Sequence, residues 1–155
     1  MKALSVRNPW AWLIVRPDIV GEQARQQAYL NGLIKDVENR SRRTNFRGEF
    51  LVHASKGMTR QEYDDALRFA LVAGVPYNAL PHADKLERGG IVGIATIEDC
   101  IASMWRTSPW HVEGQYGFQL ANAKPLPFTP CKGALGFFTV PDGVMHALRD
   151  HLATN

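Results

Sequence analysis

The sequence predicts an α+β fold built around a β-barrel or strongly bent sheet of about six strands, with flanking helices. Three observations predict this class: about six β-rich segments, loops rather than helices between most of them, and two long segments with helical periodicity. A regular β-α-β alternation, which a doubly wound parallel sheet requires, does not occur. The length of 155 residues, 45% of them hydrophobic, fits one domain over residues 1–155.

The first third of the chain predicts short strands and one brief helix. Residues 2–6 form a strand, and Asn8 caps a short helix that has Pro9 in its first turn. The predictions that follow are a polar loop at 16–27 that could carry an irregular helical turn, a polar edge strand at 34–40, a basic loop at 41–47 and a buried strand at 48–54.

The middle of the chain carries the clearest helix signal. Thr59 and Glu62 have the spacing of a capping box, apolar residues then recur on one helical face, and Gly74 ends the pattern. A long surface loop at 75–90 that could cover a site and a strand at 91–101 with a bulge or close backbone approach at Gly93 follow.

The last third predicts two strands and a helix. The strands are expected at 116–120 and 135–140, separated by a loop that contains Pro125, Pro127 and Pro130. Asp142 begins a C-terminal helix that runs to His151.

Charge is concentrated in one part of the chain. Between Lys35 and Arg60 lie seven basic and three acidic residues, whereas the whole chain has a net charge of only +3. Such a zone suits a surface that follows phosphates, although a solvated arginine-rich loop has the same composition. Two cysteines are too few for a disulfide framework, and no secretion signal or membrane span is evident, so a cytoplasmic protein is expected.

Several short motifs occur in a specific order. They are Ser-Val-Arg-Asn-Pro-Trp-Ala at 5–11, Lys-Asp-Val-Glu-Asn-Arg at 35–40, Arg-Gly at 47–48, His-Ala-Ser-Lys at 53–56 and Lys-Gly-Ala-Leu-Gly-Phe at 132–137. Together they resemble the ASCH family of the PUA-like superfamily, whose signature is Gly-x-Lys-x-x-Glu-x-Arg. Lys35, Glu38 and Arg40 match its charged positions, while Gly32 stands one residue too early.

The resemblance implies a single ASCH domain, a PUA-like β-barrel of about six strands with flanking helices. It also implies a cleft in which the signature residues face RNA or a nucleotide. Members of the family resemble RNA-binding modules, and some are enzymes. One branch hydrolyses acylated cytidine through a lysine, a threonine and a glutamate, and another is a metal-assisted ribonuclease.

The residues of this chain suit one of these two activities better than the other. An amidohydrolase needs a hydroxyl three residues after the signature lysine, but Glu38 stands there and would form an unstable anhydride as an acyl acceptor. RNA cleavage needs a base, an acid and a cation, which Lys35, Glu38, Arg40 and His53 can supply. The structural alternative is a surface Glu38–Arg40 ion pair, a solvated Lys35 and a half-buried His53.

Strand geometry constrains the signature. In a regular strand Glu38 and Arg40 share a face while Lys35 points away, so a turn or bulge at Asp36 is needed to gather all three. No cofactor is required by these residues. A divalent ion such as Mg²⁺ held by Glu38 with Asp36 or Glu98 is one alternative, without a dense carboxylate cluster to support it.

Other residues are expected to contact nucleic acid. Trp10 and Trp110 are candidates to stack on bases, although Trp10 could instead cover the core. Ser55 and Lys56 suit a phosphate contact just past a strand end. Arg42, Arg43 and Arg47 are expected to position the phosphate backbone. The expected partner is RNA or a nucleotide and not a membrane, and a non-catalytic adaptor for a protein partner is an alternative that no residue favours.

Overall fold

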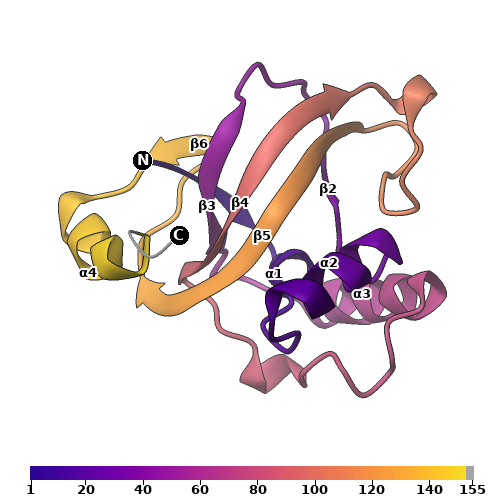
Figure 1. Ribbon diagram of the computed structural model, residues 1–155, viewed down its shortest axis with the longest axis horizontal. Coiled ribbons are helices and arrows are strands. Elements are labelled where there is room, and N and C mark those ends of the chain that lie inside the picture. Colours follow the sequence, from indigo (N-terminus) through magenta and orange to yellow (C-terminus); the bar gives the residue numbers. More distant parts are fainter. Residues whose placement is uncertain (153–155) are drawn as a thin grey trace.

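A single curled sheet of six strands organises the molecule, for which a computed structural model describes residues 1–152 (Figure 1). The strands are β1 Lys2–Val6, β2 Val37–Arg40, β3 Gly48–Ala54, β4 Gly90–Ile101, β5 Tyr116–Pro130 and β6 Phe137–Thr139. Their order in the sheet is β2-β5-β4-β3-β1-β6, with β1 and β3 parallel and the other pairs antiparallel. The predicted α+β class with a barrel-like sheet of about six strands is therefore confirmed.

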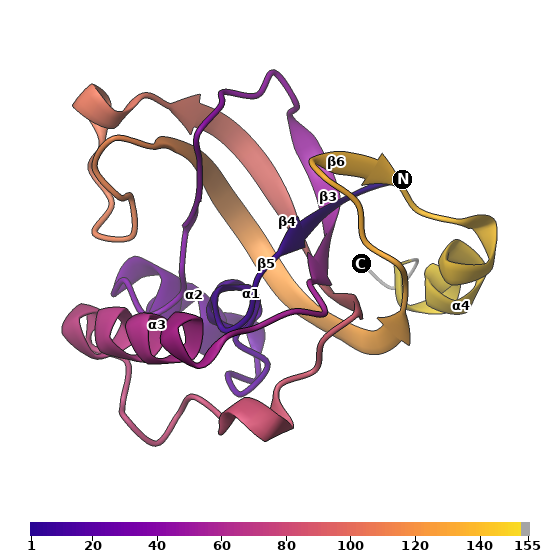
Figure 2. The ribbon, with the colours of Figure 1, turned by 180° about the vertical axis from the view of Figure 1, so that it is seen from behind.

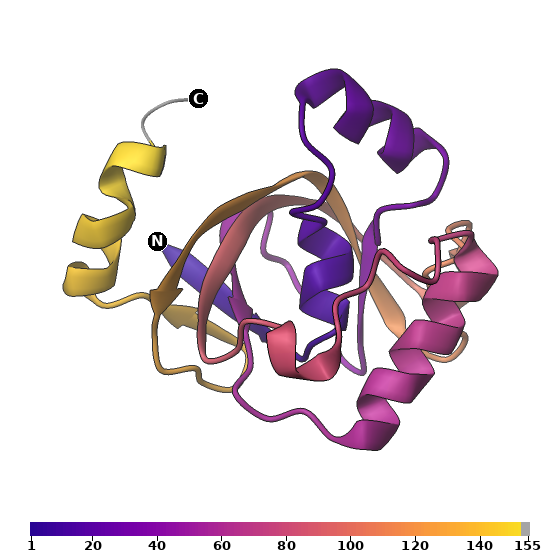
Figure 3. The ribbon, with the colours of Figure 1, turned by 90° about the horizontal axis from the view of Figure 1, so that it is seen from below.

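Four helices cover this sheet: α1 Trp10–Val15, α2 Glu22–Leu30, α3 Arg60–Ala73 and α4 Asp142–Leu152. Helix α1 lies inside the curve of the sheet (Figure 3) and contacts β3, β4 and β5. Helices α2 and α3 lie at one end of the molecule, and α4 lies at the other (Figure 2). Two short 3-10 helices, Ala83–Lys85 and Ser103–Trp105, interrupt the loops before and after β4.

Helix α1 is buried on nearly all sides because it lies between two parts of the core. Ala11, Ile14 and Val15 pack against the sheet, whereas Trp12 and Leu13 pack toward α3. A third apolar cluster fills the space between the sheet and α4. Packing against both the sheet and α3 therefore fixes the position of α1. Its first residue, Trp10, lines the candidate site described below.

Two local predictions are confirmed residue by residue. Strand β3 occupies 48–54, and α3 begins with the predicted capping box. The Thr59 hydroxyl accepts the Glu62 N–H at 3.1 Å, and the Glu62 carboxylate accepts the Thr59 N–H at 2.9 Å. Gly74 ends the helix with a φ of 101°, a conformation that glycine adopts without strain.

The helical turn that the loop at 16–27 could carry is in fact the start of a regular helix, because α2 begins at Glu22 and runs to Leu30. This helix buries only Ala28, so it lacks the apolar stripe that would have predicted it. Its position depends on Arg25, whose guanidinium donates to the carbonyls of Val15, Arg16, Ile19 and Ala123. Contacts outside the helix thus hold this polar helix in place, three of them to the preceding segment and one to Ala123 of β5.

The predicted proline-containing loop is also wrong, because β5 continues through it to Pro130. Strand β2 pairs only with residues 116–119, so the rest of β5 is an edge strand, where a missing N–H is tolerated. The pairing of β4 with β5 also changes register at three places, so the two strands stay paired although their ladder is irregular. The predicted strand at 135–140 is shorter than expected, at Phe137–Thr139.

Gly93 lies at a close backbone approach, as predicted, and the ladder with β5 shifts register beside it. A Cβ at this position would lie 2.6 Å from the Lys124 carbonyl oxygen and 2.7 Å from Val15. We expect Gly93→Ala to lower the free energy of unfolding by about 1–3 kcal/mol, measured by urea denaturation. Gly143→Ala is the control, since a Cβ there meets no atom within 4 Å; equal stability of the two variants would contradict the prediction.

No helix in residues 1–152 combines the length and the apolar character needed to cross a membrane.

Candidate functional site

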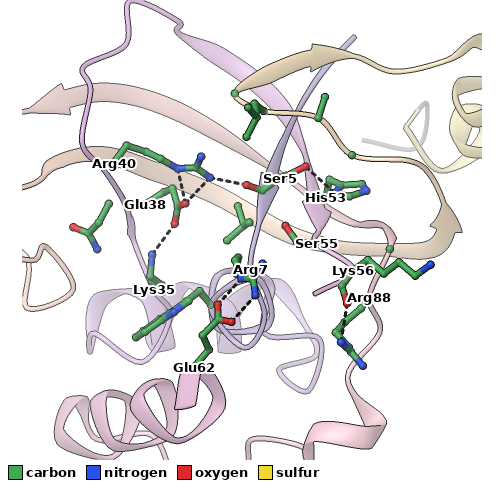
Figure 4. A pocket seen from close by; sticks show the side chains of 18 of the residues that line it. Ser5, Arg7, Lys35, Glu38, Arg40, His53, Ser55, Lys56, Glu62 and Arg88 are labelled. Atoms are coloured by element: carbon green, nitrogen blue, oxygen red, sulfur yellow. Dashed lines mark hydrogen bonds and ion pairs between the residues drawn. The ribbon is translucent and has the colours of Figure 1, made fainter. Parts of the chain in front are cut away.

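A cleft of about 1390 Å³ lies where β1, β2 and the end of β3 approach α1 and α3 (Figure 4). The loop that follows β5 forms another part of its wall. The predicted site residues in its lining are Lys35, Glu38, Arg40, His53, Trp10, Ser55, Lys56 and Trp110. The fold therefore brings residues from several of the sequence motifs together around one cleft.

Lys35, Glu38 and Arg40 form one charged cluster, which we call the signature triad. Lys35 Nζ lies 3.1 Å from Glu38 Oε1, and Arg40 Nε donates to Glu38 Oε2 at 2.9 Å. Both carboxylate oxygens are thus engaged by cations. Lys35 also donates to the Val37 carbonyl. Because Lys35 is only 3% exposed, the alternative of a solvated lysine beside a surface ion pair is wrong.

The triad forms because the chain is irregular before β2, as strand alternation requires. Strand β2 begins only at Val37, and the backbone N–H of Lys35 donates to the Leu13 carbonyl at 2.9 Å. Lys35 is therefore held by α1 and not by the sheet, so its side chain reaches the Glu38 carboxylate. The structure meets the requirement that strand alternation set in another way than by a turn or bulge at Asp36, because Lys35 and Asp36 precede the strand.

The environment of the triad changes its electrostatics. Burial lowers the pKa of the Lys35 ammonium below its usual value, and the neighbouring Glu38 carboxylate opposes this shift. One carboxylate lies between two cations, so the cluster carries a net positive charge. Arg40 also donates to the Ser5 carbonyl at 2.6 Å, which fixes β2 against β1 across the cleft.

Trp10 is an aromatic side chain beside the triad. Its ring centroid lies 5.7 Å from Lys35 Nζ, within the range of a cation–π interaction. Its edge-to-face contact with Phe69 has a centroid distance of 5.6 Å. The buried Asn8 caps this end of α1, accepting the Trp12 N–H at 3.0 Å and donating to the Glu87 carbonyl at 2.7 Å. Trp10 is half-buried and lines the cleft, where it can contact a ligand.

His53 is held by hydrogen bonds at both ring nitrogens. Nε2 lies 2.6 Å from the Cys131 carbonyl, which can only accept, so Nε2 carries the proton. Nδ1 then accepts from the Ser5 hydroxyl at 3.0 Å. This arrangement joins β1, β3 and the loop after β5, and at 2% exposure it favours a structural role for His53 over the predicted catalytic one.

Trp110 differs from its prediction. Its side chain is 0% exposed, stacks on Phe69 at a centroid distance of 5.2 Å and donates its indole N–H to the Gly32 carbonyl at 2.9 Å. The predicted role as a base-stacking platform is therefore wrong, because Trp110 belongs to the core beside the cleft.

The arginines of the loop between β2 and β3 do not line the cleft. Arg42, Arg43 and Arg47 are exposed, and Arg47 approaches Asp99 at 3.5 Å. A long polymer could still reach them, but a ligand confined to the cleft does not. Their predicted phosphate contacts stay a prediction.

The carboxylates expected beside Glu38 lie elsewhere. Asp36 lines a separate cavity of about 310 Å³ and accepts from the Ser108 hydroxyl, while Glu98 is exposed and does not line the cleft. The expected pairing of Glu38 with either acid around Mg²⁺ is therefore wrong. In the described residues 1–152, no three His, Cys, Asp or Glu side chains form a group that could hold a metal ion.

Several lining residues were not predicted from the sequence, among them Ser5, Arg7, Glu62, Arg88 and Lys132. Lys132 lies in one of the motifs that carry the resemblance, which is the only signal that marked it. Arg88 lies in a segment predicted only as a surface loop. Their place in the cleft follows from strand pairing, which no local pattern reveals.

Arg7 and Glu62 form a two-point ion pair at the mouth of the cleft. The Arg7 guanidinium lowers the pKa of Glu62 to about 2 from an ordinary value of 4.5. A lowered carboxyl pKa adds stability above about pH 4.5, and this stability is lost as the pH falls toward 2. Because the pair is partly exposed, we expect it to contribute about 1 kcal/mol or less.

Glu62→Gln tests this contribution, since glutamine preserves the capping box while removing the charge. In urea denaturation, we expect the wild type to exceed the variant in stability at pH 6 and the difference to shrink near pH 2.5. A difference that is equal at both values would contradict the prediction.

Comparison of the chain with protein-family models gives no match, and a search of curated proteins finds no similar sequence.

Proposed function

We propose that this protein is an ASCH domain of the PUA-like type whose cleft binds RNA or a nucleotide at the signature triad. The observation that carries the proposal is the buried Lys35–Glu38–Arg40 cluster in the cleft lining. Burying the charges of Lys35 and Glu38 is costly, and pairing with each other and with the partly exposed Arg40 offsets this cost while holding the N–H donors in fixed positions. Such donors suit the carbonyl oxygens of a base or the oxygens of a phosphate.

Two further features support a nucleotide-like ligand. Trp10 offers an aromatic ring next to the cationic end of Lys35, and stacking on such a ring is tolerant of base identity. The charge of the lining is also positive, with six lysine and arginine residues against two glutamates. The proposed ligand therefore combines a flat polar ring with negative charge.

Binding is tested by fluorescence anisotropy with a labelled single-stranded RNA of about ten nucleotides. We expect Kd to rise with salt concentration, because lysine and arginine contacts to phosphate release counterions. Arg40→Gln is expected to weaken binding about tenfold or more, since hydrogen bonds to charged groups contribute about 1.5–3 kcal/mol.

The matched control is Arg68→Gln, which removes the same charge from an exposed position outside the cleft. Equal affinities of the two variants, or binding that ignores ionic strength, would contradict the proposal.

RNA cleavage is a second candidate, favoured by one observation. Burial lowers the pKa of Lys35, which favours the neutral amine that a general base requires, although the Glu38 carboxylate opposes the shift. Purified protein is incubated with labelled RNA with Mg²⁺ or with EDTA. If the wild type cleaves no faster than Lys35→Met at matched purity, the nuclease candidate is withdrawn.

Hydrolysis of an acylated nucleoside has weaker support. It needs a free hydroxyl at the third position after Lys35, where Glu38 has both oxygens occupied by its cationic neighbours.

A further inference from the structure

A second group of basic side chains lines the cleft apart from the signature triad. It consists of Lys56, Arg88 and Lys132, which we call the basic trio. Figure 4 shows Lys56 and Arg88 below His53, on the opposite side of Arg7 and Ser55 from Lys35. The cleft thus has two separate cationic regions.

Strand pairing explains why the trio converges. Ala54 of β3 pairs with Gly90 of β4, and Gly90 pairs with Pro130 of β5, so these residues form one row across three neighbouring strands. Each member of the trio lies two residues beyond this row, after the end of β3, before the start of β4 and after the end of β5. The chain therefore leaves the sheet near all three residues at the same end of these neighbouring strands.

Hydrogen bonds tie these three segments together. Arg88 Nη1 donates to the Lys56 carbonyl at 2.7 Å, and the N–H of Gly89 donates to the Ala54 carbonyl at 2.7 Å. The N–H of Cys131 donates to the Gly89 carbonyl at 3.1 Å. The backbones that carry the trio are consequently fixed before any ligand arrives.

The trio differs from the other charged residues of the cleft in its partners. The two lining carboxylates are already engaged, Glu38 by Lys35 and Arg40, and Glu62 by Arg7. Within residues 1–152, no carboxylate lies within 4.0 Å of a charged nitrogen of Lys56, Arg88 or Lys132. All three side chains are exposed. Three like charges at one edge create a local field that attracts an anion.

We infer that the basic trio binds a phosphate group of the ligand, so that the cleft selects a phosphorylated nucleotide over the corresponding nucleoside. The inference rests on the proposed function, in which the signature triad holds the base end of the same ligand. Lysine and arginine together suit a phosphate, because arginine donates from a planar fork and lysine adds a compact charge. The Ser55 hydroxyl lies next to Lys56 in the lining and adds a further donor.

Isothermal titration calorimetry of the full chain tests the inference with three probes: the four nucleosides, their 5′-monophosphates and a short RNA. We expect at least one monophosphate to bind about tenfold more tightly than its nucleoside at low salt. In Arg88→Gln and Lys132→Gln the ratio of monophosphate affinity to nucleoside affinity should fall toward one, while the affinity for the nucleoside stays unchanged. Lys85→Gln, an exposed lysine outside the cleft lining, should retain it.

The outcomes separate this inference from the proposed function. Equal binding of nucleoside and monophosphate by the wild type, or an advantage that survives in Arg88→Gln and Lys132→Gln, overturns the phosphate site but leaves the cleft as a nucleoside site. An effect of these variants on RNA but not on monophosphates assigns the trio to a phosphate within the RNA chain. Absence of binding to every probe overturns both proposals.

Discussion

Glu38→Gln is expected to lower the free energy of unfolding by about 3–5 kcal/mol, the cost of removing one partner from a buried ion pair. Glu38 is the single carboxylate that compensates Lys35 and Arg40. Without it, the 3% exposed Lys35 would either keep an uncompensated buried charge or lose its proton. A loss of this size is a large fraction of the stability of an ordinary domain.

Lys35→Met is the informative comparison, because methionine keeps the length of the side chain and removes the charge. Glu38 would still be paired with Arg40 at 2.8 Å, so no buried carboxylate is left alone. We expect this variant to lose less than half as much stability as Glu38→Gln. The double variant should recover part of that loss, since it removes the buried ammonium together with its partner.

Urea denaturation at pH 7 measures all three variants. Equal losses for Lys35→Met and Glu38→Gln would show that the ammonium and the carboxylate are equally necessary, which contradicts the compensation by Arg40. Circular dichroism at low denaturant confirms that each variant is folded before its binding of RNA is compared.

Trp110→Ala is expected to destabilise the protein by about 3–5 kcal/mol, the range for truncation of a large buried aromatic residue. Trp110 is fully buried, contacts Phe69 and satisfies the Gly32 carbonyl. Trp110→Phe should cost less, because it keeps a ring against Phe69 and loses mainly the indole hydrogen bond.

Trp105→Ala is the matched control, since this tryptophan lies five residues earlier and is 71% exposed. Its removal is expected to change stability by less than about 0.5 kcal/mol. If both alanine variants unfold at the same urea concentration, Trp110 is not the core residue that its burial indicates.

The positions of the site residues differ in how far local pattern could predict them. Lys35, Glu38 and Arg40 were predicted from a short motif, and the needed irregularity near Asp36 followed from strand alternation alone. Trp10 and Trp110 could not be distinguished in this way, because both are tryptophans beside a proline. Burial separates them: Trp10 lines the cleft half-buried, whereas Trp110 is enclosed by the core.

The sequence by itself determined the elements whose signals are local. The capping box at Thr59, the strand at 48–54 and the α+β class depend on neighbouring residues or on periodicity, which the chain displays directly. Helix α2 and the proline-containing part of β5 depend instead on distant partners, Arg25 with four carbonyls and an unpaired sheet edge.

Only the tertiary structure decided which charges share the cleft. Lys56, Arg88 and Lys132 are spread over 77 positions of the chain and meet because β3, β4 and β5 pair in one register. The same pairing leaves Arg42, Arg43 and Arg47 outside, although they lie closer to the signature triad in sequence. Register is a property of strand pairs and not of either strand alone, so composition could locate the basic zone but not the residues that line the cleft.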